Sequence, residues 1–305
     1  MKYKYKHAYL IISHTQFAIL ECLLKAIDDE RNDIYVHVDR KTSIMPDVKV
    51  EHAGLYFLTD RIDVSWGDYS QIEVEMKLFG EAYNSQERLN VRYKYYHLLS
   101  GVDIPLKSQD YIHDFFDKNV GKEFLGFYQG NLSKELKRKV GVYHPFPKQF
   151  SKAREYSVKS LVRAILVRLQ LAIGGTRNKD IQLVRGTNWC SVTNAFVSFL
   201  LSKQVEIRKR FRYTFCADEV YKHTLCWNSC FRDNVYDLTN EARGCMREIN
   251  WIVTADKSWL PSFVMGDYLK LKASDALFAR KFDEDNIDVV HRILHDISFD
   301  IFNVD

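Results

Sequence analysis

Continuous apolar runs alternate with helically spaced apolar positions through the first third of the chain. Residues 7–13 (HAYLIIS) and 34–38 (IYVHV) are continuous runs, typical of strands buried on both faces of a mainly parallel sheet. Between them, residues 16–27 repeat apolar side chains one helical turn apart. A short strand, a second helix and a fourth strand follow, at residues 55–58, 71–83 and 93–99. This β-α-β-β-α-β order predicts an α/β fold whose first half, about residues 1–108, binds a nucleotide.

The pattern is less regular after residue 108. It predicts further helices at 111–117, 161–173, 194–203 and 288–297, and strands at 123–127 and 250–253. Residues 216–225 (CADEVYKHTL) also have helical spacing, and two adjacent acids, Asp218 and Glu219, stand at the start. Acids at that place cap the first turn and complement the helix dipole, so their position alone does not identify a site. We expect this second half, about residues 109–305, to form one domain with the first.

Polar residues follow three of the predicted strands. In an open parallel sheet, ligands bind beyond the carboxyl ends of the strands. The residues at those ends are Ser13 and His14, Asp39 and Arg40, and Ser100 and Asp103. Each one has an alternative role as an ordinary turn or cap residue, because Asp and Ser are common there. Several such residues at one edge of the sheet nevertheless favour a ligand site there.

Composition narrows the class of protein. The chain has 305 residues, 46% of them apolar, which is enough to bury a large core. Its net charge of +4 is too mild for a nucleic-acid binder but suits an anionic small molecule. The six cysteines lack disulfide spacing, and the N-terminus resembles no signal peptide. With no apolar stretch long enough to cross a membrane, we expect a cytoplasmic protein with free thiols.

Residues 148–179 form a basic segment. They contain eight Lys and Arg residues against a single acid, Glu155. One interpretation is a core-facing amphipathic helix with a solvated basic face. The other is contact with an anionic membrane leaflet, which would place the protein peripherally at the inner face of the membrane.

A glycine-led turn at 186–193 (GTNWCSVT) carries Trp189 into a predicted helix. This arrangement can be plain packing, but carbohydrate sites also set an aromatic platform beside a sugar ring. Together with a nucleotide-binding half, a carboxylate and the cation pair Arg280 and Lys281, it suits sugar transfer from a nucleoside diphosphate. Such transfer needs a general base for the acceptor hydroxyl and positive charge for the leaving diphosphate. Asp39 is followed by Arg40 and Lys41, and Asp60 and Asp63 are three residues apart, so neither gives a convincing Asp-any-Asp metal motif at a strand end. Arg280 and Lys281 are therefore candidate substitutes for a metal.

At this point the sequence resembles glycosyltransferase family 14, as a bacterial member. This family contains core-2/I-branching β-1,6-N-acetylglucosaminyltransferases and peptide O-xylosyltransferases. The resemblance is carried by eight ordered blocks: HAYLIISH (7–14), IYVHVDRK (34–41), VSWGDYS (64–70), YYHLLSGVDIPLKS (95–108), GTNWCSVT (186–193), CADEVYKHTLCWNS (216–229), REINW (247–251) and LFARKFD (277–283). The blocks at 247–251 and 277–283 resemble the xylosyltransferases more than the branching enzymes.

The resemblance implies a GT-A-like fold, no divalent metal and a role for each matched residue. Glu219 would be the general base of an inverting, single-displacement transfer. Lys281, with Arg280 beside it, would contact the donor diphosphate. The remaining matches would contact the nucleotide (His14, Asp39 and Trp66) or the donor sugar and acceptor (Asn188, Trp189 and Asp218), whereas Asp103 would be mainly structural.

Two departures from the family pattern bear on specificity. Ser258, with Lys257 adjacent, stands where branching enzymes carry a second diphosphate-binding arginine. Asn188 stands where the xylosyltransferases have Asp. The leading hypothesis is transfer from a UDP-sugar, UDP-GlcNAc or UDP-xylose first, to a glycan acceptor such as a lipid-linked intermediate of a capsule or surface polysaccharide. The alternatives are a catalytically silent nucleotide- or carbohydrate-binding module of the same fold and a peripheral-membrane structural protein.

Overall fold

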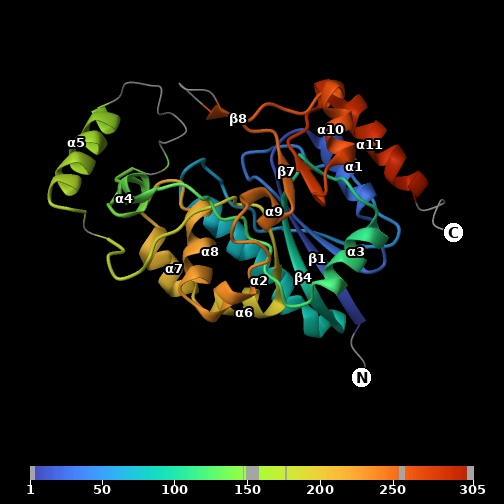
Figure 1. The fold of residues 1–305 in the computed structure, drawn as a ribbon, viewed down its shortest axis with the longest axis horizontal. Coiled ribbons are helices and arrows are strands. Elements are labelled where there is room, and N and C mark those ends of the chain that lie inside the picture. Colours follow the sequence, from blue (N-terminus) through green and yellow to red (C-terminus); the bar gives the residue numbers. More distant parts are fainter. Residues whose placement is uncertain (1–3, 147, 149–157, 176, 254–257, 301–305) are drawn as a thin grey trace.

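A five-stranded, mainly parallel sheet forms the centre of the fold (Figure 1). The computed structural model describes residues 4–146, 148, 158–175, 177–253 and 258–300. The sheet has the strand order β3-β2-β1-β4-β6. Its strands are β1 (Lys4–Ser13), β2 (Asn32–Val38), β3 (Gly54–Phe57), β4 (Val91–Ser100) and β6 (Cys190–Thr193). The first four run parallel, and β6 pairs with β4 in the antiparallel direction.

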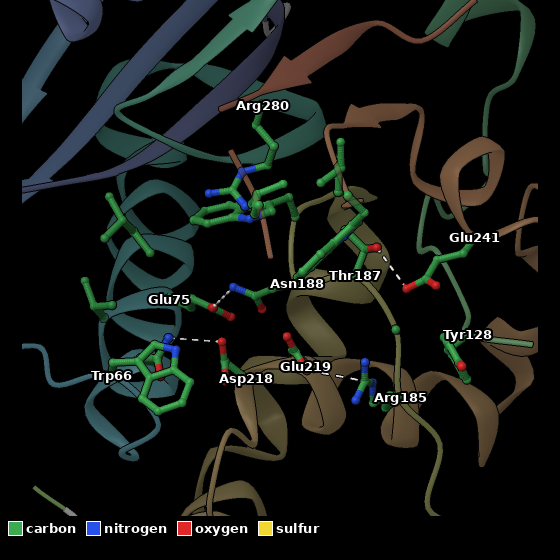
Figure 2. A pocket seen from close by; sticks show the side chains of 18 of the residues that line it. Trp66, Glu75, Tyr128, Arg185, Thr187, Asn188, Asp218, Glu219, Glu241 and Arg280 are labelled. Atoms are coloured by element: carbon green, nitrogen blue, oxygen red, sulfur yellow. Dashed lines mark hydrogen bonds and ion pairs between the residues drawn. The ribbon is translucent and has the colours of Figure 1, made fainter. Parts of the chain in front are cut away.

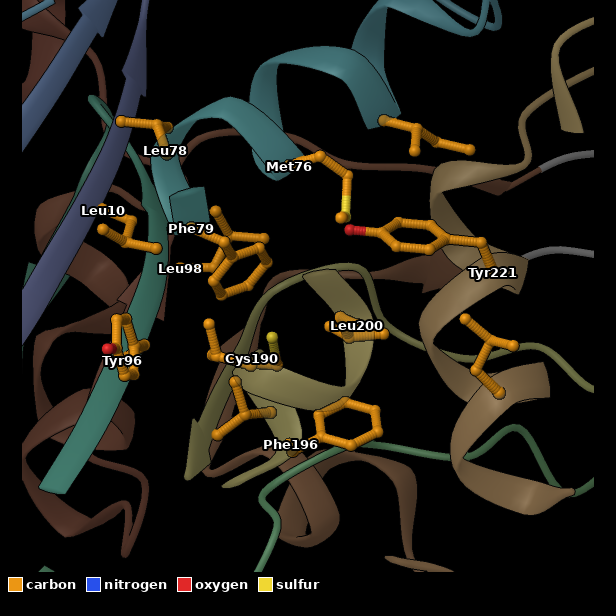
Figure 3. Packing of buried hydrophobic residues seen from close by; sticks show 14 of the residues in the cluster. Leu10, Met76, Leu78, Phe79, Tyr96, Leu98, Cys190, Phe196, Leu200 and Tyr221 are labelled. Atoms are coloured by element: carbon orange, nitrogen blue, oxygen red, sulfur yellow. The ribbon is translucent and has the colours of Figure 1, made fainter. Parts of the chain in front are cut away.

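Helices cover both faces of this sheet. In Figure 1, α1 (Phe17–Ala26), α3 (Gln109–Lys118), α10 (Tyr268–Ala273) and α11 (Ile287–Asp300) lie to its right. On the other side lie α2 (Ser70–Leu89), α6 (Asn194–Ser202), α7 (Gln204–Phe211) and α8 (Asp218–Trp227). Because side chains alternate along a strand, β1 sends Tyr9 and Ile11 into one core and Ala8 and Leu10 into the other. Figure 3 shows the second core, in which side chains of α2, α6 and α8 meet the sheet.

A second, three-stranded sheet lies beyond the carboxyl end of β4. Its strand order is β5-β10-β7, from β5 (Asp103–Pro105), β10 (Phe278–Arg280) and β7 (Arg247–Ile249). The antiparallel register of β5 and β10 sets Arg280 opposite Asp103. The other elements are α4 (Ser133–Val140), α5 (Val158–Ala172), α9 (Glu241–Cys245), the β8–β9 ribbon (Ile252–Val253 and Ser258–Trp259) and short 3₁₀ turns (Cys230–Asn234, Met265–Asp267 and Glu284–Asn286).

The predicted α/β class is confirmed, with a mainly parallel sheet flanked by helices. All four strands and both helices of the first hundred residues are present, shifted by a few residues at their ends. The six cysteines are free thiols. No helix within the described residues is long and apolar enough to span a bilayer.

Several predictions for the second half are wrong. Residues 123–127 form no strand, because Glu123, Phe124 and Phe127 each bridge a different segment at a single point. Of the predicted strand at 250–253, only Ile252 and Val253 are in a strand, β8, and the preceding strand β7 ends at Ile249. The turn at 186–193 is half strand, since β6 occupies its last four residues. The core-facing interpretation of the 161–173 helix is also wrong, because no side chain of α5 is buried.

Candidate functional site

A pocket of about 650 Å³ lies between the start of α2, the start of α8, the 185–189 segment and the end of β10 (Figure 2). This volume is in the range of small-molecule sites. Six of the residues predicted from the sequence line it: Trp66, Asn188, Trp189, Asp218, Glu219 and Arg280. The fold therefore brings together residues that are far apart along the chain.

Glu219 faces the pocket from the first turn of α8. Its side chain is 33% exposed, and its Oε2 lies 3.7 Å from Nε of Arg185. The 185–189 segment is held against α8, because the backbone N–H of Gly186 donates to the carbonyl of Glu219 at 3.0 Å. A Cβ on Gly186 would overlap the carbonyl oxygen of Gly126 and crowd the His223 ring, so only glycine allows this approach.

The neighbouring acid, Asp218, is in a different environment. Its side chain is buried and accepts a hydrogen bond of 3.1 Å from Nε2 of Gln71 on α2. Burial raises the pKa of Asp218 to about 7, and the charges of Glu219 and Glu75 act in the same direction. The two adjacent carboxyls therefore differ: Asp218 is buried and retains its proton to near neutrality, whereas Glu219 is partly exposed to the cavity.

A fully buried ion pair supports Asn188, and sequence reasoning missed it. Lys222 on α8 donates to Oε2 of Glu75 on α2, and both side chains are almost completely inaccessible. Lys222 also donates to Oδ1 of Asn188 at 2.6 Å, while Nδ2 of Asn188 donates to Glu75 at 2.7 Å. Tyr221 OH completes the set by donating to Glu75 at 2.8 Å. The sequence did contain one signal of this pair, because Glu75 is a carboxylate on the otherwise apolar face of the predicted 71–83 helix.

Arg280 lies across the pocket from Glu219 (Figure 2). Its guanidinium donates from Nε to Oδ1 of Asp103 at 3.1 Å, and its Cζ lies 4.5 Å from the ring centroid of Trp189. Asp103 is fully buried and also accepts from the backbone N–H and hydroxyl of Ser100. Asp103 at the start of β5, with Ser100 at the end of β4 donating to it, thus holds this cation in the pocket wall.

Three predicted residues are not among those that line the pocket. His14 is exposed, and its carbonyl accepts from Oγ1 of Thr42 at 3.1 Å. The Asp39 carboxylate is buried and accepts from the backbone and ammonium of Lys41. Lys281 is half-buried, and among the described residues its ammonium makes no hydrogen bond or ion pair within 4.0 Å. Lys257 lies outside the described residues.

Two further pocket residues, Trp251 and Glu241, were given no role from the sequence, although Trp251 ends the 247–251 block. Trp251 is 54% exposed, and the predicted Trp66 is 58% exposed. Glu241 accepts from Oγ1 of Thr187 at 3.0 Å, and burial raises its pKa. Exposed indole rings beside polar groups suit a carbohydrate ligand. Within the described ranges, no three His, Cys, Asp or Glu side chains are grouped so that they could hold a metal ion.

One family model and several curated proteins match this chain. The family model "Branch: Core-2/I-Branching enzyme" matches residues 7–268. Xylosyltransferase 2 of Canis lupus familiaris is 25% identical over 299 residues, which cover 90% of this chain and 32% of that protein. Xylosyltransferase oxt of Drosophila melanogaster is 22% identical over 284 residues, or 86% of this chain and 30% of that protein.

The chain spans about a third of the length of these curated relatives. Among solved structures, apo mouse Xyloside xylosyltransferase 1 aligns with a TM-score of 0.35 and 9% identity, covering 92% of this chain and 99% of that one.

Proposed function

This chain belongs to the Core-2/I-branching enzyme family, and we propose that it is a glycosyltransferase that moves a sugar from a UDP-sugar to a hydroxyl of a glycan. The observation that carries the proposal is the pocket itself. A carboxylate on α8 and a cation at the end of β10 stand on opposite sides of one cavity, with Asn188 between them. The Trp189 ring lies against the Arg280 guanidinium.

The proposed reaction is a single displacement with inversion. The acceptor oxygen attacks the anomeric carbon on the face opposite the diphosphate, while Glu219 takes the hydroxyl proton. The bond from the anomeric carbon to the diphosphate oxygen breaks, and its electron pair leaves with UDP. Arg280 and Lys281 stabilise the charge that develops on the leaving diphosphate, so the reaction needs no divalent metal.

Neighbouring groups suit these roles. Arg185, 3.7 Å from Glu219, places a positive charge beside the proposed base. Asp218 holds its own proton because burial raises its pKa to about 7, which limits the negative charge beside Glu219. Asn188, fixed by Glu75 and Lys222, presents its amide to the donor sugar or acceptor. We assign His14, Asp39 and Trp66 to the nucleotide side.

The names of the relatives bear on the donor. Xylosyltransferases are prominent among the similar proteins, which makes UDP-xylose a first donor to test beside UDP-GlcNAc. A lipid-linked glycan of a bacterial surface polysaccharide is the acceptor class that we propose.

Calorimetric titration with UDP and a panel of UDP-sugars, in excess EDTA, tests the donor site. Binding of UDP with one preferred sugar would support a metal-independent site and identify the donor. Binding that appears only with manganese would refute the assignment of Arg280 and Lys281.

Glu219→Gln then separates an enzyme from a silent binding module. We expect unchanged UDP binding and a loss of turnover of roughly 10²–10⁴-fold, the usual general-base contribution. The matched control is Glu241→Gln, which removes a different carboxyl from the same pocket and keeps a hydrogen-bond acceptor for Thr187. Equal turnover of the Glu219→Gln variant and the parent would place the base elsewhere. UDP binding without transfer to any acceptor would favour the silent module.

A further inference from the structure

Helix α5 (Val158–Ala172) turns its apolar side away from the protein. Six of its large apolar residues, and Ile173 just after it, have exposed fractions between 39% and 78%: Val158, Leu161, Val162, Ile165, Leu166 and Leu169. Their spacing of three and four residues gathers them into one stripe. A surface helix normally buries such a stripe against the core, so this one has the reverse orientation.

The opposite side of α5 attaches the helix to the body. The half-buried residues lie on that side: Ser160, Arg163, Val167, Gln170 and Leu171. The Gln170 side chain forms two hydrogen bonds with the backbone of Tyr143, accepting from its N–H at 2.8 Å and donating to its carbonyl at 2.9 Å. In Figure 1, α5 lies beside α4 at the end of the molecule farthest from α11. The polar attachment fixes which side of the helix faces outward.

Positive charges border the exposed stripe. At about 100° per residue, Lys159 and Arg168 fall on its two opposite edges. Helix α5 contains no acid, and α4 next to it adds the exposed Lys134, Lys137 and Arg138, whereas its Lys139 is paired with Glu135. Two exposed aromatic residues, Tyr143 and Phe146, lie next to the helix, with the Lys159 ammonium 5.9 Å from the Phe146 ring centroid. An apolar stripe with cations on both edges and aromatic neighbours matches an interfacial helix.

We propose that α5 docks this protein onto the surface of a membrane that contains anionic phospholipid, with the helix lying in the plane of the interface. The stripe would enter the boundary between headgroups and acyl chains, and the cations would meet lipid phosphates. A second copy of the chain is a poorer occupant. Pairing two such stripes would bring Lys159 and Arg168 against their own like charges, with no acid on the helix to compensate.

The docking surface is linked to the pocket. Glu135 on α4 accepts a hydrogen bond from Arg185, which in turn lies 3.7 Å from the carboxylate of Glu219. A membrane-bound α5 would therefore hold the pocket near the lipid surface, where a lipid-linked acceptor would be available. This last step rests on the proposed transferase activity, whereas lipid binding itself does not.

Vesicle flotation of the full chain tests the proposal, with phosphatidylcholine vesicles that either contain or lack phosphatidylglycerol. The parent should float with the anionic vesicles. Ile165→Asp/Leu169→Asp should weaken this binding by about 100-fold or more, because two apolar groups leave the interface and two anions enter. Lys159→Gln/Arg168→Gln should weaken it about fivefold per charge removed, and added salt should act in the same direction.

The matched control is Val205→Asp/Leu269→Asp, at apolar residues that are 83% and 75% exposed on α7 and α10. It should float like the parent. Unchanged UDP binding and unchanged circular dichroism would show that each variant is folded, so a loss of flotation reports the surface alone.

No flotation of the parent would overturn the proposal, as would equal flotation of the parent and the α5 variant. A parent dimer that becomes a monomer in Ile165→Asp/Leu169→Asp, without vesicle binding, would assign the stripe to a second copy instead. Vesicle binding without sugar transfer would keep the docking surface and reject only the proposed function.

Discussion

Removing the cation from the buried Glu75–Lys222 pair should destabilise the protein strongly. Lys222→Met keeps most of the side-chain volume but leaves the Glu75 carboxylate in a site where it is about 1% exposed, without its ammonium partner. Breaking a buried ion pair from one side typically costs about 3–5 kcal/mol, because an uncompensated charge remains. Tyr221 and Asn188 still donate to Glu75 in the variant, so we expect the lower end of that range.

The double variant Glu75→Gln/Lys222→Met separates the charge from the packing. It removes both charges, and the new amide keeps an oxygen for Tyr221. Its N–H₂ replaces the oxygen that accepted from Nδ2 of Asn188, so the Asn188 amide must turn over to offer Oδ1, which the loss of Lys222 leaves free. We therefore expect it to recover at least half of the free energy of unfolding that Lys222→Met loses. A matched surface control is Lys203→Met, which breaks the 3.2 Å pair with Glu206 and should cost less than about 1 kcal/mol.

Urea unfolding, followed by circular dichroism and tryptophan fluorescence, measures these free energies. UDP-sugar titration of the same variants shows whether the pair also positions Asn188. A loss in Lys222→Met no larger than in Lys203→Met would refute the electrostatic reasoning. A double variant less stable than Lys222→Met would also refute the electrostatic reasoning, because the free energy lost in Lys222→Met would then come from packing and not from the unpaired charge.

Three further predictions concern the pocket. Since burial raises the pKa of Asp218 from 3.8 to about 7, the folded protein binds this proton more tightly than the unfolded chain, and its contribution to stability falls as pH rises across that interval. From pH 5 to pH 8, the free energy of unfolding of Asp218→Asn in urea should rise relative to that of the parent by on the order of 2–4 kcal/mol. Parallel pH profiles of the two proteins would contradict the raised pKa. Lys281→Gln should weaken UDP binding about tenfold in calorimetry with no loss of stability. Arg280→Gln should lower both UDP affinity and stability, since it leaves Asp103 buried without a cation. Identical behaviour of the two variants would refute this difference in role. Gly186→Ala should lose stability and donor binding together, because the added Cβ meets the backbone carbonyl of Gly126. A melting temperature equal to that of the parent would show instead that the 185–189 segment can move away from α8.

The first half of the fold could be predicted because its signals are local. Strands such as 7–13 and 34–38 are buried on both faces, so their apolar runs are continuous and need no knowledge of partners. The 123–127 segment has a similar run, but its neighbours are single residues far away in sequence. Its apolar side chains fill the core without forming a ladder, and periodicity cannot distinguish the two cases.

The site was predicted in part, and mainly through the family blocks. These blocks name Asn188, Trp189, Glu219 and Arg280 but say nothing about what holds them. Glu75 and Lys222 are 147 residues apart, and only the packing of α2 against α8 makes them a pair. The orientation of α5 was likewise beyond the sequence, because an amphipathic pattern has the same period whether its apolar side faces inward or outward.

The strand β6 makes the two halves of the chain inseparable in practice. Because it pairs with residues 95–98 of β4 from outside the first 108 residues, a fragment ending there would leave this edge of β4 without its partner strand. Exposed strand edges recruit other strands and promote aggregation. Truncation would also remove β10 from β5, leaving Asp103 without its arginine. The half formed by residues 1–108 therefore depends for its solubility on a strand that the other half supplies, and we expect the two halves to unfold together.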